Sequence, residues 1–114
     1  MKQAIIDTNF IITCIKQKID FFEELGLAGI QIVIPDQVIS ELKKNKSSLA
    51  LKLLKKEKLF FKKINLGKGH VDKRIIDYAK ENPEVLIATL DRGIKDKIEN
   101  KKIVIRGKKK LEII

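Results

Sequence analysis

Four acidic residues of this chain stand where the side chains of a reaction centre commonly gather. Asp7 and Asp91 each end an apolar run, whereas Glu41 and Asp72 fall early in the helices expected after two such runs. If the runs are parallel strands, these side chains converge, because the carboxyl ends of parallel strands share one edge of the sheet. Converging carboxylates repel one another unless some are protonated or a hard cation is bound. The pattern therefore predicts one site for Mg²⁺ or Mn²⁺ whose metal ligands and catalytic residues are Asp7, Glu41, Asp72 and Asp91.

Metal-dependent hydrolysis of a phosphodiester is the chemistry that such a site suits. One or two bound ions lower the pKa of a bound water, hold it in line with the phosphorus and stabilise the leaving oxygen. The protein then needs no nucleophile of its own. Three small polar side chains beside the acids are predicted to orient a carboxylate or the scissile phosphate: Thr8, Asn9 and Thr89.

Taken singly, most of these acids also have a structural explanation. Asp7 and Asp91 are of a type that caps helices, and Glu41 suits a solvated helix edge. Asp72 resists that explanation, because on a helical wheel it shares the apolar arc that contains Ile75, while Asp77 points the opposite way. The prediction of a site therefore depends on the four acids together.

The elements that must position these acids alternate between strand and helix. Apolar or β-branched runs predict strands at 4–6, 30–34, 59–64, 85–90 and 103–105, with a last short one at 111–114. Amphipathic segments between them predict helices, including one at 71–80 and a lysine-rich one with Leu49, Ala50, Leu53 and Leu54 facing inward. We therefore expect a single three-layer α/β/α domain over residues 1–114, with a mainly parallel central sheet of about five strands.

The charge of the chain favours a polyanionic partner. A formal net charge of +10 over 114 residues points to nucleic acid before a membrane, although lysine enrichment also arises from genome composition or adaptation to heat. Two lysine groups are predicted to line an RNA path, if they are not simply solvated turns: Lys43, Lys44 and Lys46, and Lys108, Lys109 and Lys110. The chain has few aromatic residues, so strong sequence readout by base stacking is not expected.

Several classes of function are disfavoured by composition. Cys14 is the only cysteine, which excludes an internal disulfide and predicts a buried, inert thiol in a reducing cytoplasmic setting. His70 is the only histidine, so a zinc site built from histidines has no support. No apolar run approaches the length of a membrane span or a signal core, so a soluble protein without a membrane partner is expected.

Four motifs resemble those of a known family, the PIN-domain nucleases. IIDTNFII is similar to the opening strand with its first acid, Asp7, and PDQVISELKK to the second motif, with Glu41. VDKRIIDYA resembles the third motif, with Asp72, and IATLDRGIKDKI the fourth, with Thr89 and Asp91 in a Thr-x-Asp arrangement. The resemblance spans essentially the whole chain. It implies a single PIN-like domain with a Rossmann-like sheet that acts as a metal-dependent, single-strand-specific ribonuclease.

Within that family the sequence leaves two roles open. The chain resembles both VapC-like toxins, which imply a small antitoxin partner, and the archaeal and eukaryotic nucleases of ribosomal-RNA processing, whose ends IVIRGKKKLEII resembles. Many relatives form homodimers, and many carry a second acid where this chain has Lys73. A catalytically silent RNA-binding module is the main alternative. A receiver-like phosphoacceptor is a weaker one, because it would need two adjacent acids, which Asp7 and Thr8 do not supply.

Overall fold

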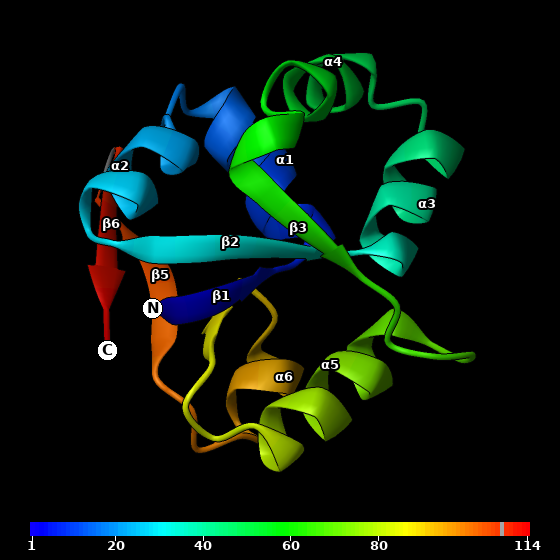
Figure 1. Ribbon diagram of the computed structural model, residues 1–114, viewed down its shortest axis with the longest axis vertical. Helices are drawn as coiled ribbons and strands as arrows, with labels where there is room; N and C mark the ends of the chain where they lie inside the picture. The colour runs from blue at the N-terminus through cyan, green and yellow to red at the C-terminus, as the bar shows by residue number, and fades with distance from the viewer. Residues whose placement is uncertain (108) are drawn as a thin grey trace.

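Strands and helices alternate along the computed structural model, which describes residues 1–107 and 109–114 (Figure 1). The strands are β1 (Lys2–Ile6), β2 (Ile30–Pro35), β3 (Phe61–Ile64), β4 (Leu86–Ala88), β5 (Lys102–Arg106) and β6 (Lys110–Ile113). The helices are α1 (Thr8–Lys16), α2 (Phe21–Leu27), α3 (Asp36–Lys44), α4 (Ser48–Lys56), α5 (Val71–Glu81) and α6 (Arg92–Lys95), with a 3₁₀ turn, η1 (Lys58–Phe60), before β3. The predicted order of elements is confirmed.

The strands form one six-stranded sheet in the order β3-β2-β1-β4-β5-β6. β1 pairs in parallel with both β2 and β4, and the outer pairs β2–β3 and β4–β5 are parallel as well. Only β6 runs antiparallel, against β5. The expected mainly parallel sheet is therefore confirmed, and the short last strand extends it by one antiparallel edge.

Two hydrophobic cores lie on opposite faces of the sheet. Because successive side chains of a strand point to opposite faces, Ile6 packs with the core under α1 to α4, whereas Ile5 packs with the core that contains Ile75 and Ile94. Figure 1 shows α1 to α4 on one side of the sheet and α5 and α6 on the other. This arrangement is the predicted three-layer α/β/α fold.

The structure corrects two predictions about where apolar side chains lie. Leu59 and Phe60 belong to η1 and are exposed, because β3 is an edge strand that pairs with β2 only from Phe61 onward. Leu49 was expected to face inward but is 68% exposed, since it lies in the first turn of α4, which packs through Ala50 and Leu54. The helix after Asp91 is a single turn, although Ile98 is still buried beyond its end.

Cys14 is fully buried in α1, as predicted. Burial raises the pKa of its thiol to about 12. A thiol with so high a pKa is almost entirely un-ionised near neutral pH, and the thiolate is the reactive form. Among the described residues, no helix is long and apolar enough to cross a membrane.

Candidate active site

The carboxyl edge of the central strands carries the predicted acids. The chain leaves β1 toward β2 and β3 on one side, while β4 and β5 lie on the other, so β1 and β4 meet where the strand order reverses. Open α/β sheets bind ligands at such a switch point. Asp7 follows β1 directly and caps α1, and Asp91 caps α6. Glu41 lies on α3 and Asp72 in the first turn of α5, so four separate elements supply the acids.

Asp7 is the most enclosed of the four acids, with 5% of its surface exposed. Its backbone N–H donates to the carbonyl oxygen of Ala88 at 3.0 Å, which extends the β1–β4 pairing by one residue. Its carboxylate accepts the backbone N–H of Thr8 at 2.8 Å on Oδ1 and the hydroxyl of Thr89 at 3.0 Å on Oδ2. Both carboxylate oxygens are thus held in fixed directions by the chain.

Thr89 joins Asp7 to Asp91. Its buried hydroxyl donates to Asp7 and accepts the backbone N–H of Asp91 at 3.1 Å. Asp91 in turn accepts the backbone N–H of Gly93 on Oδ1 at 2.7 Å. A Cβ on Gly93 would lie 3.0 Å from that same oxygen, so the absence of a side chain there leaves room for the Asp91 carboxylate.

Thr8 joins α1 to α3. Asp7 caps α1, and Thr8 is the first helical residue. The hydroxyl of Thr8 donates to Oε1 of Glu41, 33 residues away. Asn9 is exposed on α1. Two of the three predicted orienting residues therefore contact an acid of the site.

The acids influence one another electrostatically. Burial is the largest effect on Asp7 and raises the pKa of its carboxyl group. The hydrogen bonds from Thr8 and Thr89 lower that pKa. The negative charges of Asp72 and Glu41 raise it further, which means that these groups lie close enough to Asp7 to repel its ionised form.

Asp72 interacts with all the other acids. Its side chain is exposed, which corrects the expectation that it faces the apolar core: it lies at the solvent end of the helical arc, in the first turn of α5. Partial desolvation still raises the pKa of its carboxyl group, as do the charges of Asp91 and Glu41 and a side-chain hydrogen bond with Asp91. His70 lowers it. The four carboxylates thus form one repelling group.

The donor set suits a hard cation, but the side chains are spread. Carboxylate oxygens are the ligands that Mg²⁺ and Mn²⁺ prefer. Burial, and after it the charges of neighbouring acids, raises the pKa of Asp7 and Asp72. Within residues 1–107 and 109–114, no three acidic, histidine or cysteine side chains are arranged so that they could hold one ion.

A polar cleft of about 600 Å³ opens beside the acids. Its walls are α3 and the segment 65–71, and Glu41 lies on its surface. Lys44 lines the cleft, whereas Lys43 and Lys46 are exposed on the surface without lining it. Lys109 and Lys110 are exposed at the turn into β6, and Lys108 lies outside the described residues. Gln37 and Lys68 also line the cleft and were not among the predicted residues, because no local pattern marks them.

Comparison with known proteins agrees with this geometry. A family described as PIN like domain matches residues 4–109. Ribonuclease VapC4 of Methanocaldococcus jannaschii is 34% identical over 127 residues, covering 99% of this chain and 97% of that protein. The rRNA-processing protein fcf1 of Schizosaccharomyces pombe is 37% identical over 101 residues, covering 83% of this chain and 52% of that protein.

Among solved structures, that of the PIN domain endonuclease Utp24 superposes with a TM-score of 0.84 at 29% sequence identity, over 97% of this chain and 90% of that one. The family match extends over both sheet halves and all four acids. The chain therefore belongs to the PIN-like domain family and is a homologue of PIN-domain ribonucleases.

Proposed function

We propose that this protein is an endoribonuclease that hydrolyses RNA phosphodiester bonds and depends on Mg²⁺ or Mn²⁺. The observation that carries the proposal is the placement of Asp7, Glu41, Asp72 and Asp91 at one edge of the sheet. Burial first, and the charges of neighbouring acids after it, raise the pKa of Asp7 and Asp72. A purely structural role gives no reason to gather uncompensated carboxylates. Homology to a ribonuclease and to a PIN domain endonuclease supports the choice of substrate and reaction.

The chain's own residues hold the acids in place. Thr89 fixes Asp7 and the backbone of Asp91, and Thr8 fixes Glu41. When bound, Mg²⁺ or Mn²⁺ would be held by these carboxylates together with Asp72, and would supply an activated water and neutralise charge on the phosphate. Because no three of these side chains, among the described residues, are arranged to hold one ion, we expect the carboxylates to draw together on binding.

The proposal is tested by cleavage of a mixed, partly structured RNA. Purified protein is incubated with Mg²⁺, with Mn²⁺ or with EDTA, alongside Asp7→Asn, Asp72→Asn and the control Glu84→Gln. Glu84 is exposed and lies before β4, at the opposite end of the strands from the acids. We expect metal-dependent cleavage by the wild type and Glu84→Gln, and its loss in both aspartate variants.

The same assay distinguishes the proposed nuclease from a catalytically silent RNA-binding module. If the wild type binds RNA but cleaves it with neither metal, and both aspartate variants fold and bind equally well, the catalytic proposal is wrong.

An experiment in cells distinguishes the two biological roles, toxin and RNA-maturation enzyme. Growth arrest on expression of the wild type but not of Asp7→Asn, reversed by co-expression of a small partner encoded beside the gene, would favour a VapC-like toxin over a role in RNA maturation.

A further inference from the structure

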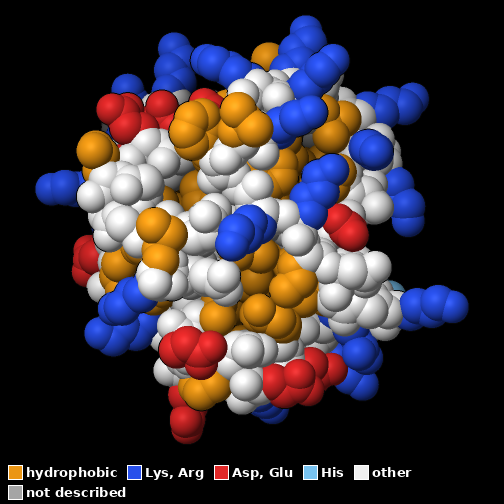
Figure 2. All heavy atoms as spheres, in the orientation of Figure 1, with side chains coloured by type: hydrophobic (Ala, Val, Ile, Leu, Met, Phe, Trp, Pro, Cys, Tyr) orange, Lys and Arg blue, Asp and Glu red, His pale blue; other side chains and the backbone are white. Residues whose placement is uncertain are grey.

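The polar cleft between α3 and the segment 65–71 continues directly from the acids. Glu41 forms part of its surface, and His70 and Val71, which line the opposite wall, directly precede Asp72 in the chain. The cleft therefore borders the acidic site at two of its members. Figure 2 shows lysine and arginine side chains projecting around much of one face of the molecule, as expected for a partner with many phosphates.

The lining of the cleft suits the backbone of a nucleic acid. Two amines, Lys44 and Lys68, can neutralise phosphates, while the hydroxyl of Ser40 can bond to ribose hydroxyls or base edges. An apolar ligand would leave these groups without partners. The volume of about 600 Å³ falls in the range of sites that take one small ligand.

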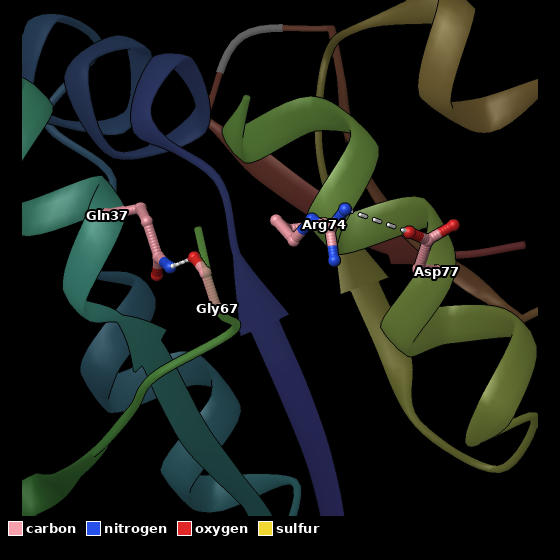
Figure 3. Close-up of polar contacts among 4 residues, drawn as sticks. All are labelled: Gln37, Gly67, Arg74 and Asp77. Carbon is pink, nitrogen blue, oxygen red and sulfur yellow. Dashed lines mark hydrogen bonds and ion pairs between the residues drawn. The ribbon is translucent and has the colours of Figure 1, made fainter. Parts of the chain in front are cut away.

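One wall of the cleft is a loop that the structure ties down. Gln37 on α3 donates a side-chain hydrogen bond to the carbonyl oxygen of Gly67, as Figure 3 shows, and its Oε1 accepts the backbone N–H of Leu66 at 3.4 Å. Gly67 also donates its backbone N–H to the side chain of Asn65 at 2.8 Å. Gln37 therefore connects the two walls and sets where the loop, with Lys68, stands relative to α3.

The other side of the loop rests on α5. Gly69 has a φ of +116°, and a Cβ there would lie 3.5 Å from Nε of Arg74. That Nε is buried and, within the described part of the chain, makes no hydrogen bond, while Nη2 of Arg74 pairs with Asp77 at 3.8 Å (Figure 3). The loop is thus confined between α3 and the helix that carries Asp72.

We propose that this cleft binds the RNA as a single strand on one side of the scissile phosphate, with Lys44 and Lys68 on backbone phosphates and Gln37 as a positioning residue for the loop. The inference rests on the proposed function for the identity of the ligand, and it adds the path that the strand takes from the acids. A single strand, unlike a duplex, also exposes base edges to polar groups such as the Ser40 hydroxyl.

The first test measures binding without cleavage. Fluorescently labelled hexauridylate is titrated in EDTA with the wild type, with Lys44→Ala/Lys68→Ala and with the control Lys55→Ala/Lys56→Ala. Both double variants remove the same charge, but Lys55 and Lys56 are exposed on α4, away from the cleft. We expect the cleft variant to lose roughly tenfold or more in affinity at low salt. A plot of the logarithm of the association constant against the logarithm of the salt concentration should be less steep for this variant, by about 1.4. Each of the two lost phosphate contacts contributes about 0.7 to that slope for a single strand.

Equal losses in the two double variants would overturn the proposal, since a nonspecific charge effect would then suffice. A stable RNA hairpin with a long paired stem provides a second arm, in which the ligand is a duplex. The duplex should bind the wild type more weakly, and its affinity should fall equally in both double variants. A cleft variant that loses duplex and single strand in equal proportion would contradict a single-strand site.

Gln37 is tested by Gln37→Glu, which keeps the acceptor for Leu66 but places a carboxylate against the Gly67 carbonyl. We expect KM for RNA to rise with little change in kcat, and no further loss of affinity when Gln37→Glu is added to Lys68→Ala. Such non-additivity shows that Gln37 acts through the loop. Additive losses, or a fall in kcat alone, would refute its positioning role.

The two proposals fail in different ways. If the wild type binds RNA through the cleft lysines but cleaves it with neither metal, the catalytic function is wrong and the binding path stands. If cleavage is metal-dependent and lost in Asp7→Asn, while Lys44→Ala/Lys68→Ala binds and cleaves as well as Lys55→Ala/Lys56→Ala, the binding path alone is wrong.

Discussion

Replacing Asp7 by asparagine should stabilise the metal-free protein while removing the proposed nuclease activity. The carboxylate is 5% exposed and its pKa is raised by burial first and by the charges of Asp72 and Glu41 as well. Ionised Asp7 therefore weakens the folded state near neutral pH. Asparagine has nearly the same shape and keeps an acceptor for the backbone N–H of Thr8.

The size of the effect follows from the two opposing contributions. The substitution weakens the hydrogen bonds from Thr8 and Thr89, because a charged acceptor binds these donors more strongly than an amide does. The raised pKa of Asp7 shows, however, that desolvation and repulsion of the carboxylate outweigh these hydrogen bonds. Replacing an unfavourable buried charge by a neutral group typically gains about 1 to 2 kcal/mol. For a domain of this size, each kcal/mol raises Tm by about 4 °C or more.

The gain should depend on pH in a defined direction. Because the pKa of Asp7 is raised in the folded state, its contribution favours folding most below the ordinary aspartate value of about 3.9, and is lost as pH rises through the folded pKa. The difference in stability between Asp7→Asn and the wild type should therefore be small in acid and grow as pH rises through the folded pKa of Asp7. Subtracting the curve of stability against pH for the wild type from that for Asp7→Asn removes the contributions of groups that titrate alike in both proteins.

The assay is thermal and chemical unfolding in EDTA across this pH range, with Glu84→Gln as control. Glu84 is exposed, so Glu84→Gln should differ from the wild type by less than about 0.5 kcal/mol at every pH. Adding Mg²⁺ should stabilise the wild type and leave the stability of Asp7→Asn unchanged. The difference in stability between the two proteins should therefore shrink or change sign. A lower Tm for Asp7→Asn in EDTA, or a gain that is the same in acid and at neutral pH, would refute the reasoning.

Three further predictions concern other residues. Thr89→Val leaves Asp7 Oδ2 and the Asp91 N–H without partners, so it should cost about 1 to 3 kcal/mol by denaturant unfolding, and Thr89→Ser should recover most of that loss. Gly93→Ala places a Cβ 3.0 Å from Asp91 Oδ1; it should weaken Mn²⁺ binding several-fold while changing stability by less than about 1 kcal/mol, and unchanged Mn²⁺ affinity would count against it. Cys14, with a buried thiol of pKa about 12, should not react with a disulfide reagent near neutral pH until the protein unfolds; rapid reaction of the native protein would contradict its burial.

The sequence predicted the sheet and the acids for the same physical reason. Apolar runs without alternation mark strands covered on both faces, and the polar residue that ends such a run must lie at the edge of the sheet. Asp7 and Asp91 were located in this way, and Thr89 was found from its spacing to Asp91. Helical periodicity placed the body of α5 correctly, with Ile75 fully buried.

Predictions were wrong where the decisive contact is distant in sequence. Leu49 satisfies the apolar period of α4, but which part of that arc is covered depends on how α4 packs against α1 and α3. The position of Asp72 on its wheel did not indicate that the first turn of α5 extends beyond the core. The partners of Thr8 and Gln37, Glu41 and Gly67, lie 33 and 30 residues away, and no local pattern specifies them.

Binding of Mn²⁺ followed by its electron paramagnetic resonance signal tests most directly whether the four acids form one metal site. The comparison is between the wild type, Asp72→Asn and Asp77→Asn, since both aspartates lie on α5 but only Asp72 interacts with the other acids. We predict that the wild type and Asp77→Asn bind Mn²⁺ with similar affinity and that Asp72→Asn binds it much more weakly. Equal binding by all three proteins, or none by the wild type, would contradict a metal site at these carboxylates.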